Sequence, residues 1–212
     1  MTGSNMILSR ININTKDDHN KMKVNHIGLT GMMASGKGEV VKVLADIGYR
    51  YISLSDIVRE EASSSGKAVS RSEMQDIGNR LRSEGGPGIL GKKIREKIST
   101  YPTGKWVIDG IRNPHEVTEL KGLNPFLLVA VISKREIILK RLTERMRDTD
   151  IADIEQLNIR LDREWGTNEP EGGQQVGKCV DISDYIIENN GNLNELKVKV
   201  LEILRQMEVE NE

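Results

Sequence analysis

Aromatic residues and cysteine are scarce in this chain of 212 residues, which contains one Phe, two Trp, four Tyr and one Cys. A lone cysteine, Cys179, has no partner for a disulfide within the chain, so a reducing, cytoplasmic compartment is expected. With so few aromatic rings, the core has to be built from Ile, Leu and Val side chains. The composition therefore predicts a cytoplasmic protein with an aliphatic core.

Long apolar runs are also absent. The longest, FLLVAVI at 126–132, has the length of a strand and is too short to span a membrane. Lys and Arg number 31 against 32 Asp and Glu, so there is no broad basic field to attract nucleic acid or an anionic membrane. These absences predict that the protein binds neither nucleic acid nor a membrane, which favours small-molecule partners. The protein is expected to be a monomer or homodimer.

Strand-like and helix-like segments alternate along the chain. The strand at 126–133 shows no polar alternation, which is typical of an inner strand buried on both faces. Alternating strands and helices predict an α/β fold, with a parallel five-stranded sheet covered by helices on both faces. The predicted strands lie at 24–30, 49–55, 105–110, 126–133 and 184–189.

The domain organisation is expected to be simple. Residues 1–22 are polar and Asn-rich, which predicts a flexible N-terminal extension before a single domain at 23–212. Two stretches, at about 56–104 and 145–178, are longer than crossover connections need, so we interpret them as insertions that move over a site. The end of the second stretch, 166–179, is glycine-rich and is expected to be a loop.

The segment GLTGMMASGKGEV at 28–40 has the pattern of a phosphate-binding loop between a predicted strand and a predicted helix. Successive backbone N–H groups at a helix N-terminus bind phosphate, and Lys37 adds a mobile cation for the β- and γ-phosphates of ATP. The motif next requires a Ser or Thr hydroxyl for Mg²⁺, but this chain has Gly38. The expected ATP-binding residues here are Gly31, Met32, Met33, Ala34, Ser35, Gly36, Lys37, Gly38 and Glu39.

The Gly-Lys-Gly of this loop resembles that of the nucleoside monophosphate kinases, in particular the adenylate kinases, where nucleotides and water hold most of the Mg²⁺. ISLSDIVRE at 52–60 is similar to their Ile-Ser-Thr-Gly-Asp-Met-Leu-Arg. The resemblance implies a three-layer P-loop kinase fold, ATP and Mg²⁺ as cofactors, and acceptor binding by Ser53, Asp56 and Arg59. One departure is Glu39, which stands where adenylate kinases have Thr.

A second likeness lies in VIDGIRNP at 107–114, which resembles the Asp-Gly-Phe-Pro-Arg segment of the same kinases. Asp109 ends a predicted strand, at the edge of the sheet where open α/β folds bind ligands. The resemblance implies that Asp109 holds Mg²⁺ through water and that Arg112 contacts the acceptor phosphate. The Pro that precedes this Arg in the family pattern is missing, and Pro114 follows it.

Further arginines follow in LKRLTERMRDTD at 139–150 and NIRLDREW at 158–165. Arg141 and Arg145 are spaced i, i+4 on one helical face, as in the kinase helix whose lid arginines stabilise the transferring phosphoryl group. By this resemblance, Arg141 and Arg145 are catalytic and Arg141 also binds ATP, while Arg147 and Arg160 bind the acceptor. A loose phosphoryl-transfer transition state needs this positioning and charge neutralisation.

The nature of the acceptor is a separate question. DYIIENNGN at 184–192 resembles the end of the dephospho-CoA kinases, which implies that Asn190 and Gly191 lie near the donor adenine. Those enzymes phosphorylate a hydroxyl and carry Asp-Ala-Asp, but this chain has Ser53 and Ser55 at the acid positions. A hydroxyl acceptor benefits from a general base, so the substitution favours a monophosphate acceptor unless Asp56 takes that role.

Nearly all of the chain, about 23–207, resembles small nucleotide kinases of archaea and bacteria, whose motifs do not define the acceptor base. Gln174 and Gln175 are candidates for hydrogen bonds to the base or the lid. The predicted function is ATP-dependent phosphoryl transfer to a nucleoside or deoxynucleoside monophosphate. Two alternatives stay open: a hydroxyl kinase similar to dephospho-CoA kinase, and a nucleotide-binding regulator with slow ATP turnover.

Overall fold

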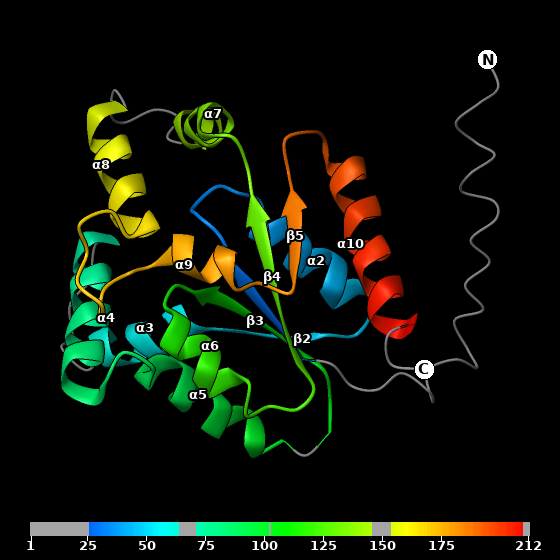
Figure 1. Ribbon diagram of the computed structural model, residues 1–212, viewed down its shortest axis with the longest axis horizontal. Coiled ribbons are helices and arrows are strands. Elements are labelled where there is room, and N and C mark those ends of the chain that lie inside the picture. Colours follow the sequence, from blue (N-terminus) through cyan, green and yellow to red (C-terminus); the bar gives the residue numbers. More distant parts are fainter. Residues whose placement is uncertain (1–25, 64–70, 102, 146–153, 210–212) are drawn as a thin grey trace.

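A five-stranded parallel sheet forms the centre of the computed structural model, which describes residues 26–63, 71–101, 103–145 and 154–209 (Figure 1). The predicted N-terminal extension at 1–22 and Arg147 lie outside the described residues. The strand order is β2-β3-β1-β4-β5. The strands are β1 (His26–Thr30), β2 (Arg50–Ser53), β3 (Trp106–Ile111), β4 (Phe126–Ile132) and β5 (Tyr185–Glu188). The predicted fold class is therefore confirmed.

Helices connect the strands and cover both faces of the sheet (Figure 1). One prediction is wrong: the segment 166–179 is not a loop throughout, because α9 begins at Val176. Its VGKCV segment buries Val176 and Cys179, so tertiary packing overrides the glycine-rich composition. The helices are α2 (Lys37–Asp46), α3 (Leu54–Ser63), α4 (Arg71–Gly85), α5 (Ile89–Ser99), α6 (Pro114–Leu120), α7 (Arg135–Arg145), α8 (Ile154–Trp165), α9 (Val176–Asp181) and α10 (Leu193–Val209).

Two aliphatic cores lie on the two faces of the sheet. Along β4, Leu128 packs with residues of α3, α5 and α6, whereas Val129 and Val131 pack with residues of α2 and α10. Side chains of a strand alternate between faces, so an uninterrupted apolar strand supplies both cores. This explains why FLLVAVI shows no polar alternation, and confirms that it lies inside the sheet, between β1 and β5.

A third, smaller apolar cluster lies beyond the carboxyl ends of the strands. Ile138 and Leu142 of α7 pack with Leu157 and Leu161 of α8, against the loop residues 32–34. Figure 1 shows α7 and α8 beyond the ends of β4 and β5. This cluster fixes α8 on the segment that joins β1 to α2, at the edge of the sheet where α/β folds bind ligands.

Within the described ranges, no helix combines the length and the apolar character needed to cross a bilayer.

Candidate functional site

The predicted phosphate loop connects β1 to α2 and has the backbone that a phosphate nest requires. Gly31 has φ +134° and Gly36 has φ +108°, values that side-chain-bearing residues rarely adopt. A Cβ on Gly31 would collide with the carbonyl oxygen of Val131, and one on Gly36 would collide with the Asn189 amide. Gly31 is therefore required by a close backbone approach, Gly36 by the buried Asn189 side chain, and both by φ.

Arg141 and Asn189 hold this loop from its outer side. The Arg141 guanidinium donates to the carbonyl oxygens of Ala34 at 3.2 Å and Ser35 at 3.3 Å, and to that of Asn189 at 3.0 Å. The Asn189 side chain, which is buried, donates to the same Ser35 carbonyl at 2.8 Å. These bonds hold the carbonyl groups of Ala34 and Ser35 and so fix this part of the loop.

Lys37, the first residue of α2, folds back over its own loop. Its Nζ donates to the carbonyl oxygens of Gly31 at 2.5 Å and Met32 at 2.9 Å. Burial lowers the pKa of Lys37, the carboxylates of Asp109 and Glu164 raise it, and the Arg112 guanidinium lowers it. The net effect is a lowered pKa, and the two acids offset part of the cost of burying the cation.

Asp109 lies near the end of β3, next to the loop, as predicted. Its Oδ1 accepts a hydrogen bond from the Gly110 backbone N–H at 2.7 Å, and Asp109 and Glu39 line the same cavity. Among the described residues, no group of three or more His, Cys, Asp or Glu side chains forms a metal cluster. Magnesium needs less, because it is usually bound by one or two carboxylates together with waters and substrate phosphates, so the residues fit it.

The residues predicted to bind the acceptor begin α3. The Asp56 carboxylate accepts the Ser53 backbone N–H at 3.0 Å with one oxygen and pairs with Arg59 through the other. Ser53 is buried, and its hydroxyl accepts the Ser55 backbone N–H at 3.1 Å. Asp56 and Ser53 therefore cap the helix, whereas Arg59 is the group with reach, because most of its side chain is exposed.

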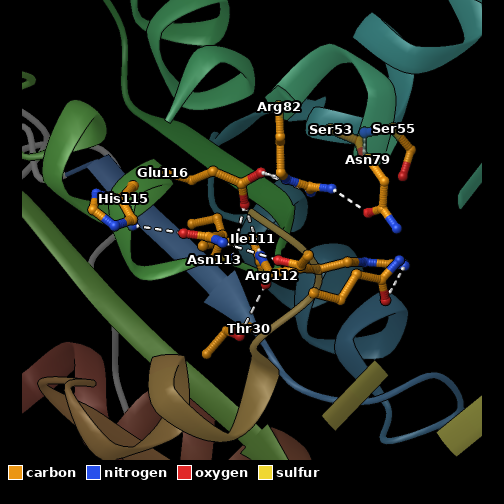
Figure 2. Close-up of polar contacts among 12 residues, drawn as sticks. Thr30, Ser53, Ser55, Asn79, Arg82, Ile111, Arg112, Asn113, His115 and Glu116 are labelled. Atoms are coloured by element: carbon orange, nitrogen blue, oxygen red, sulfur yellow. Dashed lines mark hydrogen bonds and ion pairs between the residues drawn. The ribbon is translucent and has the colours of Figure 1, made fainter. Parts of the chain in front are cut away.

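Arg112 follows β3 at the centre of the site, where Figure 2 shows its backbone beside Glu116 and Asn113. Its backbone N–H donates to the Glu116 carboxylate at 2.8 Å, which also accepts two bonds from the buried Arg82 guanidinium. The Arg112 guanidinium itself is loosely held, at 3.4 Å from Gln174 Oε1 and 3.5 Å from Glu164 Oε1. The backbone is fixed while the cation is available to an anion.

Glu164 is a site residue that we did not predict from the sequence. Its side chain is fully buried, and its Oε2 accepts the backbone N–H of Met33 in the phosphate loop at 2.7 Å. The detectable signal was its spacing, because Glu164 follows Leu157 and Leu161 on the buried face of α8. A carboxylate in an apolar stripe requires a specific partner, which here is the loop.

The elements described above enclose one large cavity of about 1140 Å³. It is lined by Lys37 and the loop, by Arg59 of α3, and by Arg160 and Arg163 of α8. Among the described residues, six cationic and two acidic side chains line it. The cationic residues are Lys37, Arg59, Arg82, Arg112, Arg160 and Arg163, and the acidic residues are Glu39 and Asp109. The cavity is therefore suited to polyanions.

Other predicted residues lie around this cavity or outside the description. Asn190 accepts the Lys134 backbone N–H at 2.9 Å through its side chain, beside Gly191 in the turn before α10. Gln174 lines the cavity, whereas the Gln175 amide donates to the carbonyl oxygens of residues 169 and 170. The side chain of Arg145 falls outside the described part, as does all of Arg147.

Comparison with known proteins identifies the family of the chain. A family model described as an AAA domain matches residues 30–158, more than half of the chain. A UPF0200 protein of Methanothermobacter thermautotrophicus is 32% identical over 85% of this chain and 90% of the relative. The chain belongs to the UPF0200 family. A second UPF0200 protein, from Sulfurisphaera tokodaii, is 34% identical over 85% of this chain and 96% of its own.

Solved structures show that the fold of this UPF0200 chain is that of P-loop kinases. TT1252 from Thermus thermophilus superposes with a TM-score of 0.53 at 18% identity, over 88% of this chain and 98% of its own. Shikimate kinase from Acinetobacter baumannii, in complex with shikimate, gives 0.52 at 17% identity, over 86% and 93%. At these identities the likeness shows the fold alone.

Proposed function

We propose that this protein transfers the γ-phosphoryl group of ATP to the phosphate of a nucleoside or deoxynucleoside monophosphate. The observation that carries the proposal is the cavity, which has the phosphate loop on one wall and Arg59, Arg112 and Arg160 around the rest. Its volume of about 1140 Å³ exceeds the range of about 300–1,000 Å³ usual for sites that hold one small molecule. Two nucleotides that meet at their phosphates match both its size and its charge.

The loop and Lys37 bind the donor. Lys37 donates to the carbonyl oxygens of Gly31 and Met32, so it exchanges these neutral acceptors for charged phosphate oxygens when ATP binds. Hydrogen bonds to charged groups are about twice as strong as those to neutral groups. Arg141 contributes by holding the carbonyls of Ala34 and Ser35, which is a positioning role.

Arg112 and Arg59 bind the acceptor phosphate. Arg112 has a fixed backbone and a guanidinium with two weak contacts, so it reorients at little cost. Arginine binds phosphate through two parallel hydrogen bonds, which fixes the phosphate oxygen that attacks. Arg160 of α8 lines the cavity and adds positive charge to it.

The acceptor is proposed to be a phosphate because α3 offers no general base. Ser53 and Ser55 occupy the positions where hydroxyl kinases of similar sequence carry acids, and both Asp56 oxygens are engaged. A phosphate acceptor is already an anion and needs no proton removal. The alternative of a hydroxyl acceptor therefore requires a base from another element.

Asp109 would hold magnesium through water, with Glu39 on the same cavity wall. When bound, the metal neutralises charge that develops on the β- and γ-phosphates. The protein side chains do the rest: they align donor and acceptor and exclude water.

The test is ADP release from Mg·ATP with a panel of monophosphates, deoxymonophosphates and dephospho-CoA. Lys37→Ala is the inactive control, and Lys121→Ala, at an exposed position after α6, is the matched control. Stimulation by a monophosphate in the native protein and in Lys121→Ala, but not in Lys37→Ala, supports the proposal. Stimulation by dephospho-CoA alone contradicts the phosphate acceptor, and ATP binding without any stimulation favours a regulator.

A further inference from the structure

The carboxylate of Glu164 occupies a position where the phosphate loop is expected to meet an anion. Its Oε2 takes the N–H of Met33 at 2.7 Å, and its Oε1 lies 3.5 Å from the Arg112 guanidinium. It also raises the pKa of Lys37. One side chain of α8 therefore faces the same loop amide and cations that a phosphate group requires.

Glu164 is incompletely satisfied in this position. The side chain is fully buried, yet its Oε1 has no hydrogen-bond partner among the described residues. A buried carboxylate is stable only when it is both paired and hydrogen-bonded, and an oxygen that lacks a hydrogen bond calls for an explanation. The geometry is that of a carboxylate held in place until a better anion arrives.

The contact lies at the terminal-phosphate end of the donor site. The lysine of a phosphate loop reaches the β- and γ-phosphates, and the N–H groups at the start of the helix cradle the α- and β-phosphates. Lys37 Nζ rests on the carbonyl oxygens of Gly31 and Met32, and Met33 is the next residue. The Met33 N–H is therefore on the γ side of the loop.

We propose that Glu164 is a specificity-determining residue of the donor site: its carboxylate occupies the place of the terminal phosphate and is displaced by a triphosphate. The inference rests on the proposed function for the location of the donor. Because two anions cannot share one set of partners, Glu164 opposes ATP most, ADP less and AMP least.

Displacement of Glu164 involves α8 as a whole. Leu157 and Leu161 of the same helix pack against loop residues 32–34, so the carboxylate and these two leucines both attach α8 to the loop. A triphosphate that replaces Glu164 on Met33 loosens one of these two attachments. The position of α8 over the cavity is thereby coupled to the number of phosphates on the donor.

The experiment measures binding of ATP, ADP and AMP by calorimetry, without acceptor, to the full chain and three variants. Glu164→Gln removes the charge and keeps an oxygen for the Met33 N–H. Glu164→Asp keeps the charge and withdraws it by one methylene. Glu155→Gln, at an exposed position on the first turn of the same helix, is the matched control. Thermal melting establishes that each variant is folded.

We expect Glu164→Gln to bind ATP about tenfold more tightly, with a smaller gain for ADP and none for AMP. Glu155→Gln should leave the ATP affinity within about twofold of the native protein, and Glu164→Asp, which withdraws the carboxylate from the Met33 N–H, should give a gain smaller than that of Glu164→Gln. Equal gains for all three nucleotides, or no gain for ATP, overturn the inference. If Glu164→Gln shows no gain for ATP and also loses phosphoryl transfer, Glu164 belongs to the acceptor site instead.

Failure of the proposed function gives a different result. If the native protein binds ATP and Glu164→Gln shows no gain, only the role of Glu164 is overturned. If neither protein binds any nucleotide, the donor site is absent and both proposals are overturned. An ATP site that appears only in Glu164→Gln supports the inference in its strongest form.

Discussion

Individual side chains of the site differ in how far the sequence revealed them. The phosphate loop was predictable because its glycines, Lys37 and the flanking strand and helix are contiguous in the chain. Glu164 was missed because its partner, Met33, lies 131 residues away. Asn189 was missed for the same reason, since a lone Asn after a strand carries no motif. A motif whose residues are contiguous can be identified in one sequence, whereas a contact between residues far apart in the chain cannot.

The loosely held guanidinium of Arg112 yields a prediction on the acceptor side. Arg112→Lys keeps the charge but loses the bidentate geometry, so we expect the KM for the acceptor to rise by about tenfold or more, with ATP affinity unchanged. Steady-state kinetics on the acceptor found in the panel measures this. Arg95→Lys, at a half-exposed arginine paired with Glu119 on α6, is the control. An unchanged acceptor KM in Arg112→Lys would remove Arg112 from the acceptor site.

Cys179 lies in the core, and its pKa predicts its reactivity. Burial raises the pKa of Cys179 to about 12, with a further rise from Glu116, against smaller decreases from Thr30 and Arg82. At pH 8 the thiolate fraction is then about 10⁻⁴, compared with about 10⁻¹ in the unfolded chain. We expect Ellman's reagent to label Cys179 only after unfolding.

The same shift makes stability depend on alkaline pH. The thiol of the unfolded chain loses its proton first as the pH rises, so the free energy of unfolding begins to fall above about pH 9. This contribution of Cys179 to stability is complete below pH 9 and is lost as the pH approaches 12. Rapid labelling of the folded protein at pH 8 would show that the thiol is not protected.

At the scale of elements, one buried ion pair joins α4 to α6. Arg82 and Glu116 are 3% and 0% exposed, and Glu116 also accepts the backbone N–H groups of Arg112 and Asn113 (Figure 2). The Asn113 side chain caps α6, and Pro114 occupies its first turn. The burial of this ion pair was not predictable from the sequence, because the pattern around Arg82 and around Glu116 indicates an exposed charge on an amphipathic helix.

This pair predicts a large loss of stability. Glu116→Gln leaves a buried guanidinium without its charge partner, so we expect the free energy of unfolding to fall by about 3–5 kcal/mol. Urea denaturation measures the change. Glu84→Gln, which affects an exposed pair with Arg80, should change it by less than about 1 kcal/mol. A loss of similar size in both variants would mean that burial of the pair contributes nothing.

At the scale of the whole molecule, the two segments predicted as insertions face each other across the cavity. Arg163 of α8 donates to Asp76 of α4 at 3.2 Å and to Glu169 at 2.9 Å, and lines the cavity. The helical nature of both segments was predictable from their amphipathic patterns. Their approach was not, since it depends on an exposed ion pair between residues 87 positions apart.

The Arg163–Asp76 contact is expected to act on acceptor binding. Asp76→Asn breaks the bridge between α8 and α4, so the acceptor KM should rise by up to about fivefold, while the melting temperature stays nearly unchanged. Arg163→Gln, which also loses the contact with Glu169, should raise the acceptor KM at least as much, and the two effects should be less than additive in the double variant, because both changes remove the Arg163–Asp76 contact. Fully additive effects in kinetics would show that the two residues do not act as a bridge.

The anchoring of the phosphate loop by Asn189 has a consequence for synthesis on the ribosome. The amide that holds the Ser35 carbonyl comes from 154 residues further along the chain, directly after β5. Contacts of such long sequence separation form only when both partners are available. A nascent chain that has emerged as far as β4 already displays the Gly-Lys-Gly motif but lacks its clamp. The proposed donor site is therefore completed only after the residues that follow β5 have emerged, so a chain that ends at β4 is expected to lack this clamp.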